Sequence, residues 1–110
     1  MNLLYINSST LGQGDENLGN KLMVSFLKSL IKNNTRIHAV FCVNSGAFLT
    51  CQNPETIALF KELNQKGAVI STCGTCLDFY GLRDQLQVGE AGSMDLAITL
   101  MQQADQVIRP

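Results

Sequence analysis

The cysteines are the residues of this chain with the most reactive side chains. Cys73 and Cys76 form a C-x-x-C motif, whereas Cys42 and Cys51 stand apart from it and are separated by eight residues. The thiolate form of cysteine is the nucleophile and the metal ligand. The motif therefore predicts either covalent sulfur chemistry or reversible disulfide formation. The other two cysteines do not form a second C-x-x-C pair, so their spacing argues against a four-ligand zinc site, and no metal or cofactor is expected.

The elements that must position these thiols follow from the hydrophobic pattern. Short apolar runs alternate with amphipathic stretches, which is typical of β-α-β units around a parallel sheet. Strands are expected at residues 3–6, 37–43, 68–72, 86–88 and 106–109. Asp15, Asn53 and Ser93 are expected helix N-caps, and a short helix should run from the motif to Tyr80. The chain is predicted to be one α/β domain, residues 1–110, with a three-layer, doubly wound, mostly parallel five-stranded sheet.

The helices should each cover the sheet with one face. For the first and last helices the apolar positions expected on that face are Leu18, Leu22, Met23, Phe26, Leu27, Leu30 and Ile31, and then Met94, Ala97, Ile98 and Met101. These positions recur at helical spacing, while the lysines of the first helix lie outside the stripe.

The candidate site follows from this topology. Ligands of such sheets bind in the loops at the carboxyl ends of the strands. Three loops qualify, at residues 7–14, 44–53 and 73–76, and three of the four cysteines lie in two of them. We expect Cys73 and Cys76 to be catalytic. The expected substrate-binding residues from the same loops are Cys51, Asn44, Ser45, Gly74 and Thr75.

The four thiols are expected to differ in role. Cys73 should begin a helix outside the core, where the helix end adds about 0.3–1 kcal/mol for an anion, less than one pKa unit at about 1.4 kcal/mol. A moderately activated thiol suits passing sulfur between docked proteins. Cys76, one turn further on, either helps to release that sulfur, forms a disulfide with Cys73, or packs as a small apolar residue. Cys42 should fill the core, and Cys51 either lines the site or packs beneath it.

Composition narrows the classes of function. Apolar residues make up 45% of the chain and charged residues 15%, with a formal net charge of −1. Such a composition favours a well-filled core, and no basic stripe for nucleic acid is present. No segment is long and apolar enough for a signal peptide or a membrane span. We therefore expect a cytoplasmic protein with reduced cysteines.

Several runs of residues resemble one family. They are Ser9 to Asp15, Leu18-Gly19, Asn44-Ser45-Gly46, Leu49-Thr50-Cys51, Cys73 to Leu82, and Val88-Gly89-Glu90 with Met94. Together they are similar to the C-terminal, DsrE/DsrF-like domain of the YedF family of selenium-metabolism proteins. In the wider group the sulfur-carrying cysteine precedes a glycine by eight residues, which fits Cys73 and Gly81.

The resemblance implies a cysteine persulfide relayed to or from donor and acceptor proteins, and assembly as homo- or hetero-oligomers. Many YedF proteins carry an N-terminal TusA-like domain, a candidate partner that is missing here, so we expect a stand-alone member or an excised domain. Two alternatives stay open. One is a thiol–disulfide redox module at Cys73–Cys76, disfavoured because neither proline is placed like the cis-proline of thioredoxins. The other is a non-catalytic partner-docking domain.

Overall fold

The computed structural model describes residues 1–110. Its helices and strands, in chain order, are β1 (Asn2–Ile6), α1 (Glu16–Lys32), β2 (Ala39–Cys42), the 3₁₀ helix η1 (Asn44–Thr50), α2 (Pro54–Gln65), β3 (Val69–Cys73), α3 (Gly74–Phe79), the 3₁₀ helix η2 (Arg83–Gln85), β4 (Glu90–Gly92), α4 (Met94–Gln103) and β5 (Gln106–Ile108). None of the helices is long and apolar enough to cross a membrane.

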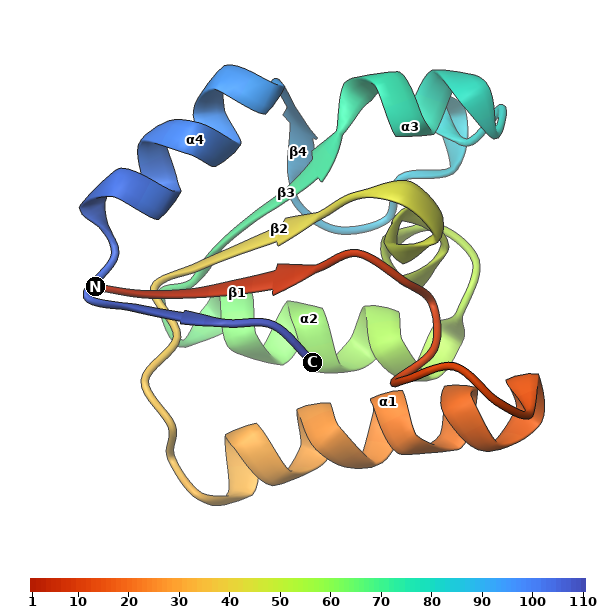
Figure 1. Cartoon of the computed structure of the whole chain (residues 1–110), viewed down its shortest axis with the longest axis horizontal. Coiled ribbons are helices and arrows are strands. Elements are labelled where there is room, and N and C mark those ends of the chain that lie inside the picture. The colour runs from red at the N-terminus through yellow and green to blue at the C-terminus, as the bar shows by residue number, and fades with distance from the viewer.

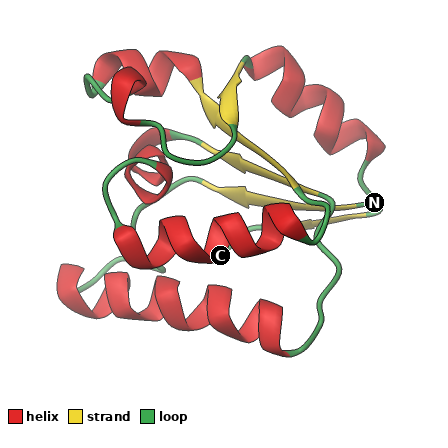
Figure 2. Ribbon diagram, turned by 180° about the vertical axis from the view of Figure 1, so that it is seen from behind, coloured by secondary structure: helices red, strands yellow, loops and turns green.

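The strands form one sheet in the order β4-β3-β2-β1-β5, and every neighbouring pair is parallel. The chain first moves outward from β1 to β4 and then returns to place β5 on the other side of β1. Because parallel crossovers are right-handed, this reversal puts α1 and α2 on one face of the sheet and α4 on the other. Figures 1 and 2 show these three layers, with α3 on the same side as α4. The predicted α/β class and doubly wound sheet are confirmed.

The long helices begin at the predicted caps. The Asp15 carboxylate accepts the Leu18 N–H at 3.0 Å, and the Ser93 hydroxyl accepts the Leu96 N–H at 3.1 Å. The Asn53 side chain caps α2 in the same way, with Pro54 at the first helical position. Each cap satisfies one of the backbone donors that a helix leaves free at its start.

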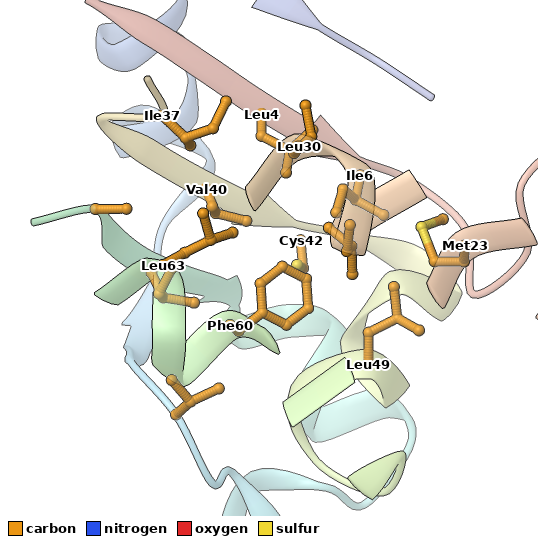
Figure 3. Close-up of a cluster of buried hydrophobic side chains, with 14 residues drawn as sticks. Leu4, Ile6, Met23, Leu30, Ile37, Val40, Cys42, Leu49, Phe60 and Leu63 are labelled. Carbon is orange, nitrogen blue, oxygen red and sulfur yellow. The ribbon is translucent and has the colours of Figure 1, made fainter. Parts of the chain in front are cut away.

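The main core lies between the sheet and the α1–α2 layer. β2 is buried at all four positions, as its continuous apolar run predicts. Figure 3 shows its Val40 and Cys42 side chains facing this layer, with Cys42 pointing toward Phe60 of α2. Cys42 is therefore a buried residue of the main core, as expected.

A smaller core lies on the opposite face, under α4. Leu3, Phe41 and Cys73 contribute to it from the strands, and Ala97 contributes from α4. The predicted face of α4 is partly wrong, because Met94 and Ile98 are exposed. A ten-residue helix covers only part of a five-stranded sheet.

The predicted face of α1 is also partly wrong. Leu18 and Leu22 are exposed, whereas Gly19, Met23 and Leu27 are buried. The stripe that meets the sheet is therefore narrower than the full set of apolar residues. Gly19 lets α1 approach the loop after β1, because a Cβ at this position would lie 2.6 Å from the Thr10 Cβ.

The fourth strand lies elsewhere than predicted. Residues 86–88 precede it as a loop, and β4 is the polar segment Glu90–Gly92. Val88 is buried from that loop, so its apolar character reflects packing and not strand pairing. β4 is an edge strand with exposed side chains, and it needs only backbone pairing to β3. The apolar residues at 86–88, which predicted a strand, therefore belong to a loop that faces the core.

Candidate thiol site at the carboxyl edge of the sheet

Three loops meet at one edge of the sheet, as the topology predicts. β1, β2 and β3 are parallel neighbours, with Ile6 opposite Cys42 and Cys42 opposite Thr72. Their carboxyl ends therefore lie side by side. η1 packs against the end of both β2 and β3, and α3 begins directly where β3 ends. This edge brings the C-x-x-C motif and the residues after β2 together.

Cys73 is the last residue of β3 and the residue that precedes α3. It is only 3% exposed and packs in the smaller core with Phe41 and Ala97. The prediction that this position lies outside the core is wrong, because the side chain points back under α4. Its thiol makes no capping bond to α3, which has only six residues. The part of Cys73 in sulfur chemistry remains a prediction.

Cys76 is the more accessible thiol of the pair. It is partly exposed and packs between the two smaller apolar clusters of the site end. The Asn44 backbone N–H donates to Cys76 Sγ at 3.1 Å. Burial raises the pKa of Cys76, a hydrogen bond with the Cys73 thiol raises it further, and the Asn44 N–H opposes both. Cys73 and Cys76 therefore lie in the same apolar cluster, where Cys73 influences the pKa of Cys76.

Asn44 is held in place by its conformation and by a tyrosine. Its φ of +53° lies in the left-handed region, which asparagine tolerates better than most residues. The Tyr80 hydroxyl donates to Asn44 Oδ1 at 3.0 Å, and the Tyr80 ring packs on Phe48 with centroids 4.7 Å apart. These contacts aim the Asn44 N–H at Cys76. The sequence-based prediction included Asn44 but omitted Tyr80.

An apolar hollow of about 410 Å³ opens above Cys76. It is lined by Val43, Asn44, Thr75, Cys76, Phe79, Tyr80 and Met94. Asn44, Thr75 and Cys76 of this lining were among the predicted site residues, whereas Val43, Phe79, Tyr80 and Met94 were not. Two of these residues, Phe79 and Tyr80, are adjacent aromatic residues directly before Gly81, and this pairing is the sequence feature that could have indicated them. A groove of about 450 Å³ runs along α1 and is lined mainly by lysines and other polar residues, none of them a cysteine.

Gly74 supports the site from behind. Its carbonyl accepts from Arg83 Nη2 at 3.2 Å, and Arg83 Nε also donates to Asp78 Oδ1 at 2.6 Å. A Cβ at Gly74 would lie 2.9 Å from Arg83 Nη2, so glycine leaves room for this brace. The hydrogen bond from Arg83 holds the pKa of Asp78 below its usual value. The charge of Asp78, which would oppose a nearby thiolate, is thus paired with a guanidinium.

Ser45 and Cys51, two of the predicted substrate-binding residues, do not line the hollow. Ser45 Oγ accepts the Ser9 backbone N–H at 3.0 Å and so fixes the loop after β1. Cys51 is 5% exposed and packs with Leu77 and Leu82 beneath α3. Burial raises the pKa of Cys51. Of the two roles considered for Cys51, the structure shows packing beneath the site.

All four cysteines are free thiols. Cys42 is fully buried, which raises its pKa to about 12. No group of three or more histidine, cysteine, aspartate or glutamate side chains is placed to hold a metal ion. The accessible chemistry at this edge therefore belongs to Cys76, with Cys73 directly behind it.

Fold and site together define a small α/β protein with a thiol pair at the carboxyl edge of a parallel sheet. A family model described as "DsrE/DsrF-like family" matches residues 1–110, so the chain belongs to that family. The family is generally linked to sulfur relay. No curated protein is significantly similar in sequence.

Solved structures show the same fold. The ychN protein from E. coli superimposes with a TM-score of 0.69 at 19% identity, over 100% of both chains. MTH1491 from Methanobacterium thermoautotrophicum, a protein of unknown function, gives 0.71 at 18% identity over 99% of this chain and 97% of that one. BT1422 from Bacteroides thetaiotaomicron, also of unknown function, gives 0.65 at 12% identity over 98% and 94%. At these identities the likeness concerns the fold alone.

Proposed function

We propose that this protein is a carrier and transferase of sulfur, or of its analogue selenium, which holds the transferred atom as a persulfide on the Cys73–Cys76 pair. The observation that carries the proposal is the environment of Cys76, namely its exposure and its hydrogen bond. The residue is partly exposed and lines an apolar hollow, its Sγ accepts the Asn44 N–H at 3.1 Å, and it packs in the same apolar cluster as Cys73. A thiolate accepts such a bond more strongly than a thiol does, so the N–H favours the reactive form.

The burial of the two thiols supports a division of roles. A donor protein reaches Cys76 first, because Cys73 is 3% exposed. The Cys76 thiolate attacks the terminal sulfur of the donor's persulfide; the donor's S–S bond breaks, and the donor leaves as a thiolate. Cys73 then attacks the same sulfur, whose bond to Cys76 breaks as its bond to Cys73 forms, and a proton passes to Cys76. Neither step has a net oxidation, and the inner persulfide is shielded from solvent.

The pKa of Cys76 sets the expected pH dependence. Its pKa is raised, chiefly by burial, so the thiol is mostly protonated at neutral pH and thiolate increases as the pH rises. Loading should therefore become faster with increasing pH until the thiol has ionised. An accepting partner that covers the hollow and offers a base would have the same effect.

Loading by a cysteine desulfurase with cysteine, followed by intact mass, tests the proposal. We expect one added sulfur in the wild type, none in Cys76→Ser, and an adduct on Cys76 alone in Cys73→Ser. Cys51→Ala is the matched control, because Cys51 is nearly as buried as Cys73 (5% against 3% exposed) and does not line the hollow. Circular dichroism checks that each variant is folded. An adduct that survives in both Cys73→Ser and Cys76→Ser would overturn the proposal.

We also propose which chemical element is carried, which partner is used and how the protein assembles. The similarity of the Cys73–Leu82 run to YedF sequences favours selenium metabolism, a TusA-like domain as partner and work in the cytoplasm. Exposed apolar side chains of α4 outside the hollow, Leu96 and Ile98, favour a homo-oligomer. Loading with a selenium donor and native mass spectrometry address these points. A sulfur adduct with no selenium adduct, or a monomer at every concentration, would count against them.

A thiol–disulfide redox module is the second candidate. It is favoured by the packing of Cys73 and Cys76 in one apolar cluster, where both thiols are free. Oxidation to a disulfide would remove two hydrogens, which intact mass detects. Ready oxidation together with no sulfur uptake would favour this module over the carrier.

A further inference from the structure

The rim of the Cys76 hollow exposes two large apolar side chains. Phe79 of α3 is 83% exposed and Met94 of α4 is 51% exposed, and both line the hollow. Figure 1 shows α3 and α4 on either side of β4, and both helices contribute residues to the lining of the hollow. Fully exposed phenylalanine is unfavourable in water, and aromatic and methionine side chains are enriched where proteins bind one another. Their position beside the accessible thiol marks this rim as a contact surface.

The same part of the chain is acidic. Residues 74–103 carry Asp78, Asp84, Glu90 and Asp95 but a single basic residue, Arg83, which is paired with Asp78 at 2.6 Å. All five lysines precede residue 67, and three of them lie along the α1 groove in the opposite layer. The segment between residues 74 and 103 therefore has a net negative charge and no free cation. At the hollow itself this charge comes from the exposed Asp95 beside Met94, because Asp78 is paired and Glu90 lines a separate hollow.

We propose that this acidic, apolar rim docks the protein that exchanges sulfur with Cys76, and that the partner presents its own thiol on a segment combining apolar side chains with lysine or arginine. The proposal rests on the sulfur-carrier function. Charge complementarity selects the partner, because opposite charges around an apolar contact steer association and fix orientation. Phe79 then supplies the contact area and Asp95, next to Met94, supplies the charge.

The charge of the rim also argues against free sulfur compounds as the source. Hydrosulfide holds sulfur at the sulfide level, so it cannot form a persulfide on a free thiol without an oxidant. Inorganic polysulfide is an anion, and the carboxylate of Asp95 beside the hollow lowers its local concentration. A cationic protein that carries a persulfide meets no such barrier. The sulfur should therefore arrive covalently bound to a partner.

Two synthetic peptides carrying a cysteine persulfide test the inference: KLCLK and its acidic counterpart ELCLE. The measured quantity is the rate of sulfur transfer to the protein, followed by intact mass at low ionic strength and at about 1 M salt, where charges more than about 3 Å apart are screened. We expect the cationic peptide to react about tenfold faster at low salt, and the difference to vanish at high salt.

Surface variants locate the effect. Asp95→Lys should reduce the preference for the cationic peptide to about threefold or less, whereas Glu62→Lys on α2 makes the same charge change in the opposite layer and should leave it intact. Phe79→Ala should slow both peptides several-fold, and Leu18→Ala, which truncates an exposed leucine of α1, should slow neither. These residues are on the surface, so the fold is retained.

The outcomes separate the docking proposal from the function. Equal rates for both peptides, with normal loading by the desulfurase, would overturn the docking surface and leave the carrier intact. No sulfur uptake from the peptides or the desulfurase would overturn both. If Phe79→Ala instead dissociates a homo-oligomer in sedimentation experiments, the occupant of the rim is a second copy of this chain, and the proposed partner is wrong.

Discussion

A pair of buried threonines fixes η1 over the end of β3, and its energetics can be predicted closely. Thr50 Oγ1 and Thr72 Oγ1 lie 2.8 Å apart, and both residues are fully buried. The Thr50 hydroxyl donates to the Ala47 carbonyl at 3.1 Å, so the Thr72 hydroxyl must donate to Thr50. Thr72 has no other partner within the protein. The pair is therefore asymmetric, and its two valine variants should differ.

Thr72→Val removes one hydrogen bond and leaves Thr50 bonded to Ala47, so we expect it to lower the free energy of unfolding by about 1 kcal/mol. Thr50→Val leaves the Thr72 hydroxyl buried without a partner and should cost about 2–3 kcal/mol. The double variant removes that hydroxyl too, so its cost should be about 2 kcal/mol. The predicted coupling is thus about 1–2 kcal/mol, with the double variant less destabilised than the sum of the singles.

Urea unfolding followed by far-UV circular dichroism gives the three free energies. Thr99→Val on the exposed side of α4 is the control and should change stability by less than about 0.5 kcal/mol. Because η1 positions Asn44 at Cys76, Thr50→Val should also slow sulfur loading although both thiols are present. Additive effects, within about 0.3–0.5 kcal/mol, would refute the assigned hydrogen bonds.

Three further predictions concern single sites. Gly89→Ala should destabilise the protein by more than about 3 kcal/mol, because its φ is +74° and the new Cβ would lie 2.2 Å from a carbonyl oxygen of β3. Cys42, with a pKa of about 12, should resist iodoacetamide at pH 8 in the folded protein, and peptide mapping should find Cys76 modified first. Arg83→Gln should raise the pKa of Asp78 toward its usual value in an NMR titration. The pKa of Asp78 is lower in the folded state than in the unfolded state. The ion pair therefore stabilises the protein at pH values above the unfolded-state pKa, and this stabilisation is lost as the pH falls through the folded-state pKa.

Each of these predictions has a control. Gly67 also has a positive φ, of +106°, but open space around it, so Gly67→Ala should cost clearly less than Gly89→Ala; equal costs would contradict the proposed clash. Alkylation of Cys42 as fast as in urea would contradict its burial. An Asp78 pKa that is unchanged in Arg83→Gln would show that another group lowers it.

Much of the scaffold could be predicted because its signals are local. Asp15, Asn53 and Ser93 each place a side-chain acceptor beside free helix donors, and all three act as caps. The run of β2 predicts burial on both faces of a central strand. Once the strands are parallel, their carboxyl ends must share an edge, so the meeting of Asn44 with the C-x-x-C motif also follows.

The position of the fourth strand and the burial of Cys73 could not be predicted, because they depend on which distant segment packs against each face of an element. Val88 is apolar because it fills the core from a loop, while Glu90–Gly92 pairs through its backbone alone. Cys73 is buried because α4, twenty residues later in the chain, happens to close over it. The accessible thiol is consequently the second cysteine of the motif, which only the packed structure distinguishes from the first.

The position of β5 has a consequence for how the molecule opens. β5 pairs with β1 at Leu3 and Val107, so this pairing closes a loop of about a hundred residues, the most costly closure in the sheet by chain entropy. The strand is only three residues long, and Val107 is largely exposed. Hydrogen exchange should therefore show the β5 amides opening locally, well before those of β2, which should exchange only on global unfolding. The unit that unfolds first is then the edge farthest from β3 and β4, and the thiol site keeps its scaffold while that edge is open.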